Sequence, residues 1–186
     1  MTTYIYLPIA TQEMKNFASK LNLGSKYTLS NYFLSGNGKA VTRFFGGCLR
    51  SLAAWDELLV ICHGSTGGSR FTGVDRNGSL KKYDPKQLVR AIEKEGLTKS
   101  FIDLKLLICG SGLSPKKREN GTDIVLAEPF AKRVCDELKN SHYSNIRVTG
   151  YLGNVATDGK ITVLRDGEQG GKHYHADIPG SFKVYR

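Results

Sequence analysis

The sequence predicts an α/β fold in which helices flank a largely parallel central sheet. Two strongly apolar runs, 57–62 and 101–109, are typical of strands that are covered on both faces. The segment 84–97 between them has the signals of a helix, with Asp84 as its N-terminal cap and Pro85 at its first position. Strand, helix and strand in this order favour a parallel pair joined by a crossover helix.

Length and composition indicate one domain over residues 1–186. A chain of this size buries about 70% of its unfolded surface, so its core needs no covalent staples. No apolar stretch approaches the roughly 18 residues of a membrane span, and no basic and apolar leader is readable at the N-terminus. We therefore expect a cytoplasmic protein, or one that is exported by a signal-less route.

The first quarter of the chain predicts two strands and two helices. Residues 3–9 are rich in β-branched and aromatic side chains and indicate a strand, and 26–34 suggests another. The segment 40–55 is expected to be helical despite two adjacent glycines. A helix is also expected over 11–22, and the side chains of its apolar face are Met14, Phe17, Ala18 and Leu21.

The middle of the chain predicts a hairpin, a loop and a helix. Residues 70–83 read as a short hairpin, because Asn77-Gly78 suits a type I′ turn. Residues 110–122 are expected to form a loop and 123–140 a helix, whose regular part begins near Pro129. The apolar face of that helix consists of Phe130, Val134, Cys135 and Leu138.

The last quarter predicts strands. Residues 145–155 form one strand, and 157–164 adds an Asp-Gly turn and a return strand. Residues 181–186 are expected to form a final edge strand. No internal repeat and no linker divides the chain, which supports a single domain.

The cysteines and histidines give no pattern of a structural metal site. The four cysteines are widely spaced and form no CxxC pair, so we expect reduced thiols, no disulfide scaffold and no zinc. His173 and His175 could share a metal on one strand face, but a solvated loop explains them more simply. The sequence therefore predicts neither a metal nor a required cofactor.

The formal net charge of +10 is compatible with several anionic partners. Charge alone would suit nucleic acid, anionic lipid, an acidic peptide or a phosphorylated small molecule. The densest basic run, 116–118, has the composition of a solvated loop, and no nucleic-acid-binding motif accompanies it. Binding to nucleic acid or to a membrane is not expected.

Each of the two buried strands ends on a reactive side chain followed by glycine. His63 and Gly64 follow the first strand, and Cys109 and Gly110 end the second. Because parallel strands end at the same edge of a sheet, the thiol and the imidazole are expected to meet there. A thiol is mostly protonated at neutral pH, and a neighbouring imidazole can take its proton and later protonate a leaving amine.

The glycines fit the same interpretation. The N–H groups beside Gly64 and at Cys109 can hold the oxyanion of a tetrahedral intermediate. Cys62 is expected to point to the opposite face of the sheet from His63. The alternative is that Cys109 is a buried small apolar residue and His63 a loop histidine. The paired strand ends favour catalysis.

The chain resembles the caspase-like cysteine peptidases (clan CD), and among them the bacterial-toxin cysteine protease domains. The resemblance covers roughly residues 56–165. It depends on "HG" after one apolar strand, "CGSG" after the next, and the hairpins and helices between and after them. It implies a three-layer fold with a C-terminal β-hairpin. Cys109 would be the nucleophile, His63 the general acid/base, and Gly64 part of the oxyanion hole.

The resemblance also implies a substrate and a regulator. The specificity pocket of the family lies beside the nucleophile, which nominates Ser111, Gly150 and Tyr151 as substrate-binding residues. Lys116–Arg118 is a candidate for selecting acidic substrate residues. Toxin members are activated by inositol hexakisphosphate, and the residues of this chain that would form the anion pocket are Lys160, Arg165, Lys172 and Lys183. A bacterial effector or toxin with a role in virulence is the implied setting.

The chain departs from the caspases themselves at the nucleophile: the caspase motif Q-A-C-[RQG]-G is absent, since the chain reads "LICGS" around Cys109. Two rival enzymatic interpretations lack their signatures. No G-x-S-x-G of a serine hydrolase and no G-x-x-x-x-G-K-[ST] of a phosphate-binding loop occurs. A non-catalytic basic α/β module that binds a partner protein or an anionic ligand remains the alternative of a different class.

Overall fold

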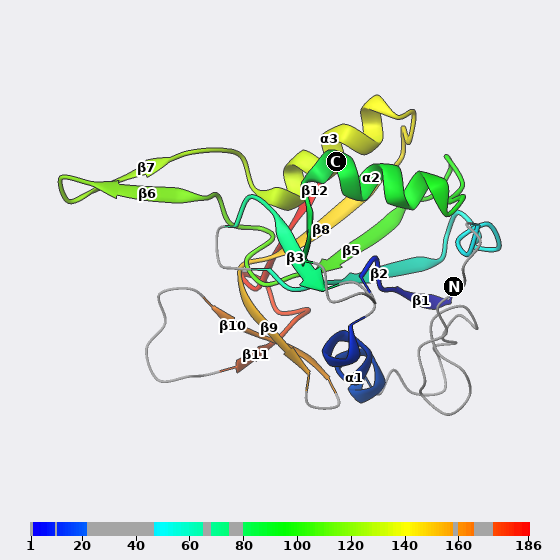
Figure 1. The fold of residues 1–186 in the computed structure, drawn as a ribbon, viewed down its shortest axis with the longest axis horizontal. Coiled ribbons are helices and arrows are strands. Elements are labelled where there is room, and N and C mark those ends of the chain that lie inside the picture. The colour runs from blue at the N-terminus through cyan, green and yellow to red at the C-terminus, as the bar shows by residue number, and fades with distance from the viewer. Residues whose placement is uncertain are drawn as a thin grey trace.

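A five-stranded sheet forms the centre of the structure, and four of its strands are parallel (Figure 1). The computed structural model describes residues 2–9, 11–21, 47–64, 68–74, 80–157, 160–165 and 173–186. In sheet order, the strands are β1 (Thr3–Tyr6), β2 (Glu57–Ile61), β5 (Asp103–Leu107), β8 (Arg147–Tyr151) and β12 (Phe182–Tyr185). Only the edge strand β12 runs antiparallel to its neighbour. The predicted α/β class with a mostly parallel sheet is confirmed.

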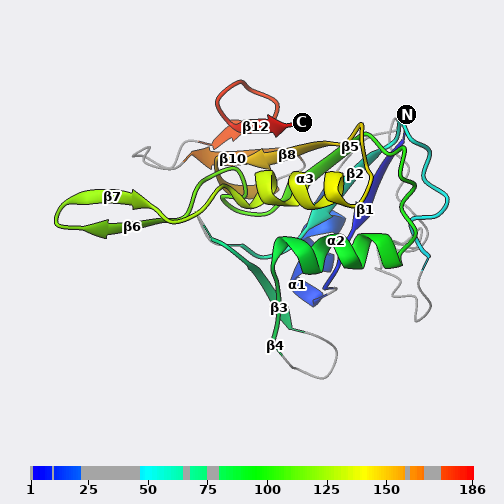
Figure 2. The same ribbon diagram turned by 90° about the horizontal axis from the view of Figure 1, so that it is seen from above.

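In the described part of the chain, three helices cover the two faces of this sheet. Helices α2 (Pro85–Lys94) and α3 (Phe130–Asn140) lie side by side on one face, and α1 (Gln12–Lys20) lies on the other (Figures 1 and 2). Among the described residues, no helix has both the length and the apolar character needed to cross a membrane. The arrangement places helices, sheet and helix in successive layers.

Local sequence signals explain where the helices begin. The Asp84 carboxylate accepts the Gln87 N–H, and the Gln87 side chain accepts the Asp84 N–H, which closes a capping box before α2. The Thr11 hydroxyl accepts the Met14 N–H at the start of α1. Helix α3 begins directly after Pro129, as predicted.

Three smaller antiparallel units are attached to the central sheet. Strands β3 (Phe71–Val74) and β4 (Leu80–Tyr83) pair as the strands of the predicted hairpin, and its predicted turn at Asn77-Gly78 lies outside the described residues. Strands β9 (Gly153–Thr157), β10 (Ile161–Arg165) and β11 (His173–His175) form a three-stranded sheet on the same side as α1 (Figure 1). Strands β6 (Lys116–Glu119) and β7 (Thr122–Val125) form a solvent-exposed hairpin that projects from the body (Figures 1 and 2).

Alternation along the strands divides the core between the two sheet faces. Leu58, Val60 and Cys62 belong to the cluster that packs under α2 and α3. Leu59 and Ile61, from the same strand, belong to the cluster that packs under α1. Side chains of odd-numbered residues at the end of β2 therefore point toward α1, and His63 continues that series.

Three predicted elements in the first and last parts of the chain differ from the structure or lie outside its described part. Of the helix predicted over 40–55, residues 40–46 lie outside the described residues. Residues 47–55 form turns instead of a helix, and the Glu95 carboxylate accepts the N–H groups of Gly47 and Cys48 at their start. The strand predicted over 26–34 lies outside the described residues. The segment 145–155 contains two strands, β8 and β9, which belong to different sheets.

The loop predicted over 110–122 and the start of the helix predicted at 123 are wrong. Residues 116–125 form the β6–β7 hairpin instead, and helix α3 starts only at Phe130. Asn120 and Gly121 both have positive φ angles, 49° and 81°, as a type I′ turn requires. Asn120-Gly121 is a turn signal in the sequence. The strands on either side of it have no apolar face, so no alternation of apolar and polar residues marks them as strands.

Candidate active site

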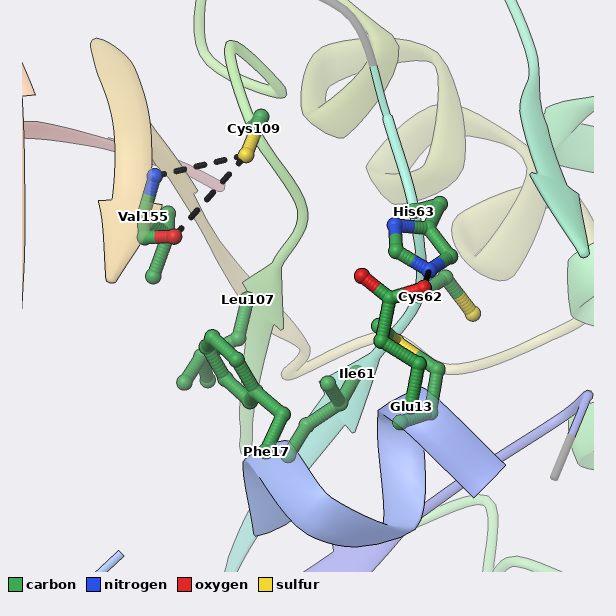
Figure 3. A pocket seen from close by; sticks show the side chains of 9 residues that line it. Glu13, Phe17, Ile61, Cys62, His63, Leu107, Cys109 and Val155 are labelled. Atoms are coloured by element: carbon green, nitrogen blue, oxygen red, sulfur yellow. Dashed lines mark hydrogen bonds and ion pairs between the residues drawn. The ribbon is translucent and has the colours of Figure 1, made fainter. Parts of the chain in front are cut away.

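The ends of β2 and β5 bring His63 and Cys109 to one cavity. The two strands are neighbours in parallel register, with Ile61 opposite Leu107, so His63 and Cys109 each lie two residues beyond the same paired position. Both residues line a cavity of about 170 Å³ on the α1 side of the sheet (Figure 3). The other lining residues are Glu13, Met14, Phe17, Ile61, Cys62, Leu107 and Val155.

His63 is held from two sides. Its backbone carbonyl accepts the N–H of Thr72 on β3 at 3.1 Å, which fixes the chain beyond the end of β2. Its ring nitrogen Nε2 lies 3.0 Å from a carboxylate oxygen of Glu13, in the first turn of α1. In Figure 3 the other ring nitrogen, Nδ1, lies on the edge of the imidazole toward Cys109. The imidazole is 38% exposed and therefore accessible from solvent.

Cys109 is held by β9. The N–H of Val155 donates to Sγ, with nitrogen and sulfur 3.4 Å apart, and the Val155 carbonyl oxygen lies 3.9 Å from Sγ. Figure 3 shows the thiol directed at Val155 and not at the imidazole. The thiol is partly exposed, so it can be reached from the cavity. A turn of the Cys109 side chain is needed before sulfur and imidazole can exchange a proton.

Gly64 is required where the two strand ends approach. A Cβ at this position would lie 2.4 Å from Ile108 Cγ2 and 2.9 Å from the carbonyl oxygen of Cys109. Contacts below 3.0 Å force a neighbour to move, and one of these neighbours is backbone. The glycine thus lets the chain after His63 pack against the backbone of Cys109.

Two backbone N–H groups at the strand ends are candidates for an oxyanion hole. Within the described residues, the N–H groups of Gly64 and Cys109 have no backbone acceptor. The next amide, that of Gly110, is already bonded to the carbonyl of Gly153 at 2.8 Å. Free N–H groups next to a nucleophile are what an oxyanion hole requires.

The other three cysteines are buried. Cys48, Cys62 and Cys135 are all enclosed in the core under α2 and α3. Burial raises the pKa of the Cys62 thiol well above its usual value, and burial also raises that of Cys135. Both thiols are therefore protonated and inert at neutral pH. Cys62 packs on the opposite face from His63, as expected from alternation.

The three residues nominated for substrate binding are not open to a ligand. The buried Ser111 hydroxyl donates to the Leu106 carbonyl and accepts the N–H of Tyr151, both at 3.1 Å. A Cβ at Gly150 would lie 2.5 Å from the Cβ of Ala131, so this glycine admits α3 to the sheet. Tyr151 is enclosed in the core, where burial raises its pKa. These positions build the fold around β8.

Three of the four residues nominated for an anion pocket lie in the described structure, on or beside strands of two different sheets. Lys160 precedes β10 and Arg165 ends it, about 17 Å apart for a strand of this length. The Arg165 guanidinium stacks over the Tyr174 ring at 3.9 Å and donates to the Pro179 carbonyl at 3.1 Å. Lys183 is exposed on β12 of the central sheet. Lys172 lies outside the described residues.

Within the described part of the chain, no group of three or more His, Cys, Asp or Glu side chains could hold a metal ion. His175 lies 3.4 Å from the carboxylate of Asp177, through Nδ1. This pair lies on and just after β11, and neither residue lines the cavity of His63 and Cys109.

The sequence did not indicate the contribution of α1 to the cavity. Glu13, Met14 and Phe17 reach it from a helix that is 50 residues before His63 in the chain. Periodicity predicted that Met14 and Phe17 are on the buried face, but no local signal pairs Glu13 with a particular histidine. Only the packing of α1 onto the sheet establishes that contact.

No protein-family model matches the chain, and no curated protein is similar to it in sequence. Fold and site together define an α/β domain that holds a partly exposed cysteine and a histidine at adjacent strand ends. What such a domain does is argued below from that geometry.

Proposed function

We propose that the protein is a cysteine endopeptidase that uses Cys109 as nucleophile and His63 as general acid/base. The observation that carries this proposal is the shared cavity of the two side chains at the ends of neighbouring parallel strands. Both residues are accessible from solvent, whereas the other three thiols are buried. A structural cysteine has no need of such a position.

The first half of the reaction forms an acyl-enzyme. Cys109 turns from β9, and His63 takes its proton. The thiolate then attacks the carbonyl carbon of the peptide bond, and the N–H groups of Gly64 and Cys109 bind the oxygen that becomes negative. When the carbon–nitrogen bond breaks, His63 returns its proton to the leaving amine, and a thioester remains on Cys109.

The second half restores the enzyme. His63 takes a proton from a water molecule, and the resulting hydroxide attacks the thioester carbonyl in the same oxyanion site. The carbon–sulfur bond breaks, the acid product leaves, and the proton on His63 returns to the thiolate. Atoms and charges balance without a metal or a cofactor as a reactant.

The caspase-like class is part of this proposal. The mostly parallel sheet with helices on both faces supports it, as does the order of the histidine strand, hairpin, helix and cysteine strand. A protein or peptide would be the substrate. The resemblance to toxin domains makes a delivered bacterial effector the proposed setting and inositol hexakisphosphate the activator to test.

One observation favours a second candidate, a non-catalytic basic module. The Cys109 sulfur accepts a hydrogen bond from the Val155 N–H and faces Val155 instead of His63. A structural cysteine would have such a contact. Catalytic hydrogen bonds often form only when a substrate binds, so the peptidase also accommodates this contact. The formal net charge of +10 would then attract an acidic partner.

A diverse peptide library separates the candidates. We expect peptide cleavage, read by mass spectrometry, with the wild type and a loss of at least about 10⁴-fold with Cys109→Ala. Cys135→Ala, which removes a buried thiol of α3 that does not line the cavity, is the matched control and should keep its activity. Each incubation is repeated with inositol hexakisphosphate. Cleavage that persists in Cys109→Ala, or that is absent from the wild type in both conditions, contradicts the proposal.

A further inference from the structure

We propose that Glu13 is a positioning residue that holds the His63 imidazole with Nδ1 facing Cys109. The carboxylate lies 3.0 Å from Nε2, within hydrogen-bond distance. This role has meaning only if His63 is the general base, so it depends on the proposed peptidase function. It replaces the two-residue site expected from the sequence with a site of three residues from three elements.

The contact determines which nitrogen carries the proton. A carboxylate only accepts hydrogen bonds, so Nε2 next to Glu13 must be the protonated nitrogen. A neutral imidazole has one N–H, and its other nitrogen is then a proton acceptor. That nitrogen is Nδ1, on the ring edge toward Cys109 in Figure 3. Glu13 thus leaves the basic nitrogen where a thiol proton must be received.

The packing of α1 places the carboxylate. Helix α1 begins at Gln12, directly after its cap Thr11, and buries Met14, Ala18 and Leu21 against the sheet. Met14 also lines the cavity, so the residue before it lies at the cavity rim. The first turn of a helix favours a negative side chain, because the helix dipole is positive there. The position of Glu13 follows from buried contacts of its neighbours.

Glu13 also has a part in the reaction itself. When His63 takes the thiol proton it becomes a cation, and a carboxylate 3.0 Å from Nε2 stabilises that cation while the proton stays on the ring. A buried carboxylate in this role contributes about 10⁴-fold to the rate. Glu13 is 74% exposed, so solvent weakens the effect, and we expect about tenfold.

The chain contains a matched control. Asp177 pairs with His175 through a ring nitrogen at 3.4 Å, and its side chain is exposed to the same degree as that of Glu13. Neither member of this pair lines the cavity. Asp177→Asn therefore removes one carboxylate from an exposed histidine pair without touching the candidate site.

The test compares Glu13→Gln and Asp177→Asn with the wild type. Alkylation of Cys109 by iodoacetamide and peptide cleavage are measured at neutral pH, and the tautomers of the four histidines are read from ¹⁵N NMR. We expect Glu13→Gln to slow both reactions about tenfold and to remove the Nε2–H preference of His63. Asp177→Asn should change neither. A merely structural role of Glu13 would leave the tautomer as in the wild type.

The outcomes separate this role from the proposed function. If Glu13→Gln matches the wild type in rate and tautomer while His63→Gln abolishes cleavage, the positioning role is wrong and the peptidase stands. If His63→Gln leaves alkylation and cleavage unchanged, the peptidase itself is wrong. Because Glu13 is exposed on the first turn of α1, neither the fold nor the docking of the helix depends on its side chain.

Discussion

The two faces of the central sheet differ in chemistry. Under α2 and α3, the buried side chains of β2, β5 and β8 are apolar. On the α1 face, the same strands begin with polar or ionisable side chains and end at an apolar cluster and the cavity of His63 and Cys109. The polar residues are Glu57, Asp103, Lys105 and Thr149. One face therefore contributes most of the stability, and the other carries ionisable groups at a cost in stability.

The largest expected effect on stability tests the apolar face. Leu104→Ala removes a fully buried side chain under α2 and α3 and should lower the free energy of unfolding by about 3 kcal/mol. Phe17→Ala, at the cavity on the other face, removes a half-buried ring and should cost about 1 kcal/mol. Denaturant unfolding measures both. Equal losses would mean that the two faces do not differ in this way.

The next effect concerns the place where the strand ends meet. Gly64→Ala puts a Cβ against Ile108 and the Cys109 backbone and should cost about 2 kcal/mol in unfolding free energy. A displacement near 1 Å should also slow peptide cleavage about 100-fold. Gly121→Ala, in the exposed hairpin turn, has open space around it and should leave cleavage unchanged. If Gly64→Ala were as active as the wild type, close packing at Cys109 would not matter to the site.

The smallest effect is a pH dependence on the α1 face. Burial raises the pKa of the Asp103 carboxyl above its usual range, and the opposing attraction of Lys105 does not cancel it. The folded state then binds this proton more tightly than the unfolded chain, so the stabilisation is present at low pH and is lost as pH rises above about 4. Wild type should lose unfolding free energy relative to Asp103→Asn between pH 4 and 7.

A titration of stability by denaturant unfolding checks this sign. If the unfolding free energy of the wild type instead rose relative to that of Asp103→Asn with increasing pH, the ion pairs of Asp103, and not its burial, would dominate its pKa.

The strongest signals in the sequence predicted the strands of the central sheet. They did not predict contacts between residues that are far apart in the chain. The runs 57–62 and 101–109 were predicted because strands buried on both faces need continuous apolar residues. The parallel pairing of these strands then implied that His63 and Cys109 share an edge. Glu13 was missed, because which residue a helix presents to a partner 50 positions away depends on how it docks. The β6–β7 hairpin was missed because its exposed strands have no apolar alternation.

The substrate-binding residues that the resemblance nominated are buried in the structure. Ser111 lies in the turns after β5, and Gly150 and Tyr151 lie within β8. Their hydrogen bonds and contacts hold β8 and α3 together instead. Sequence distance from a nucleophile says little about which side of a sheet a residue faces.

The central claim is that His63 acts on the sulfur of Cys109, and alkylation kinetics test it most directly. Exposure alone makes Cys109 react faster than the three buried thiols, so the informative comparison is between wild type and His63→Gln. At pH 7 we expect iodoacetamide to label Cys109 about tenfold more slowly in His63→Gln, and at the wild-type rate in His175→Gln. Equal labelling of Cys109 in all three proteins would contradict the claim.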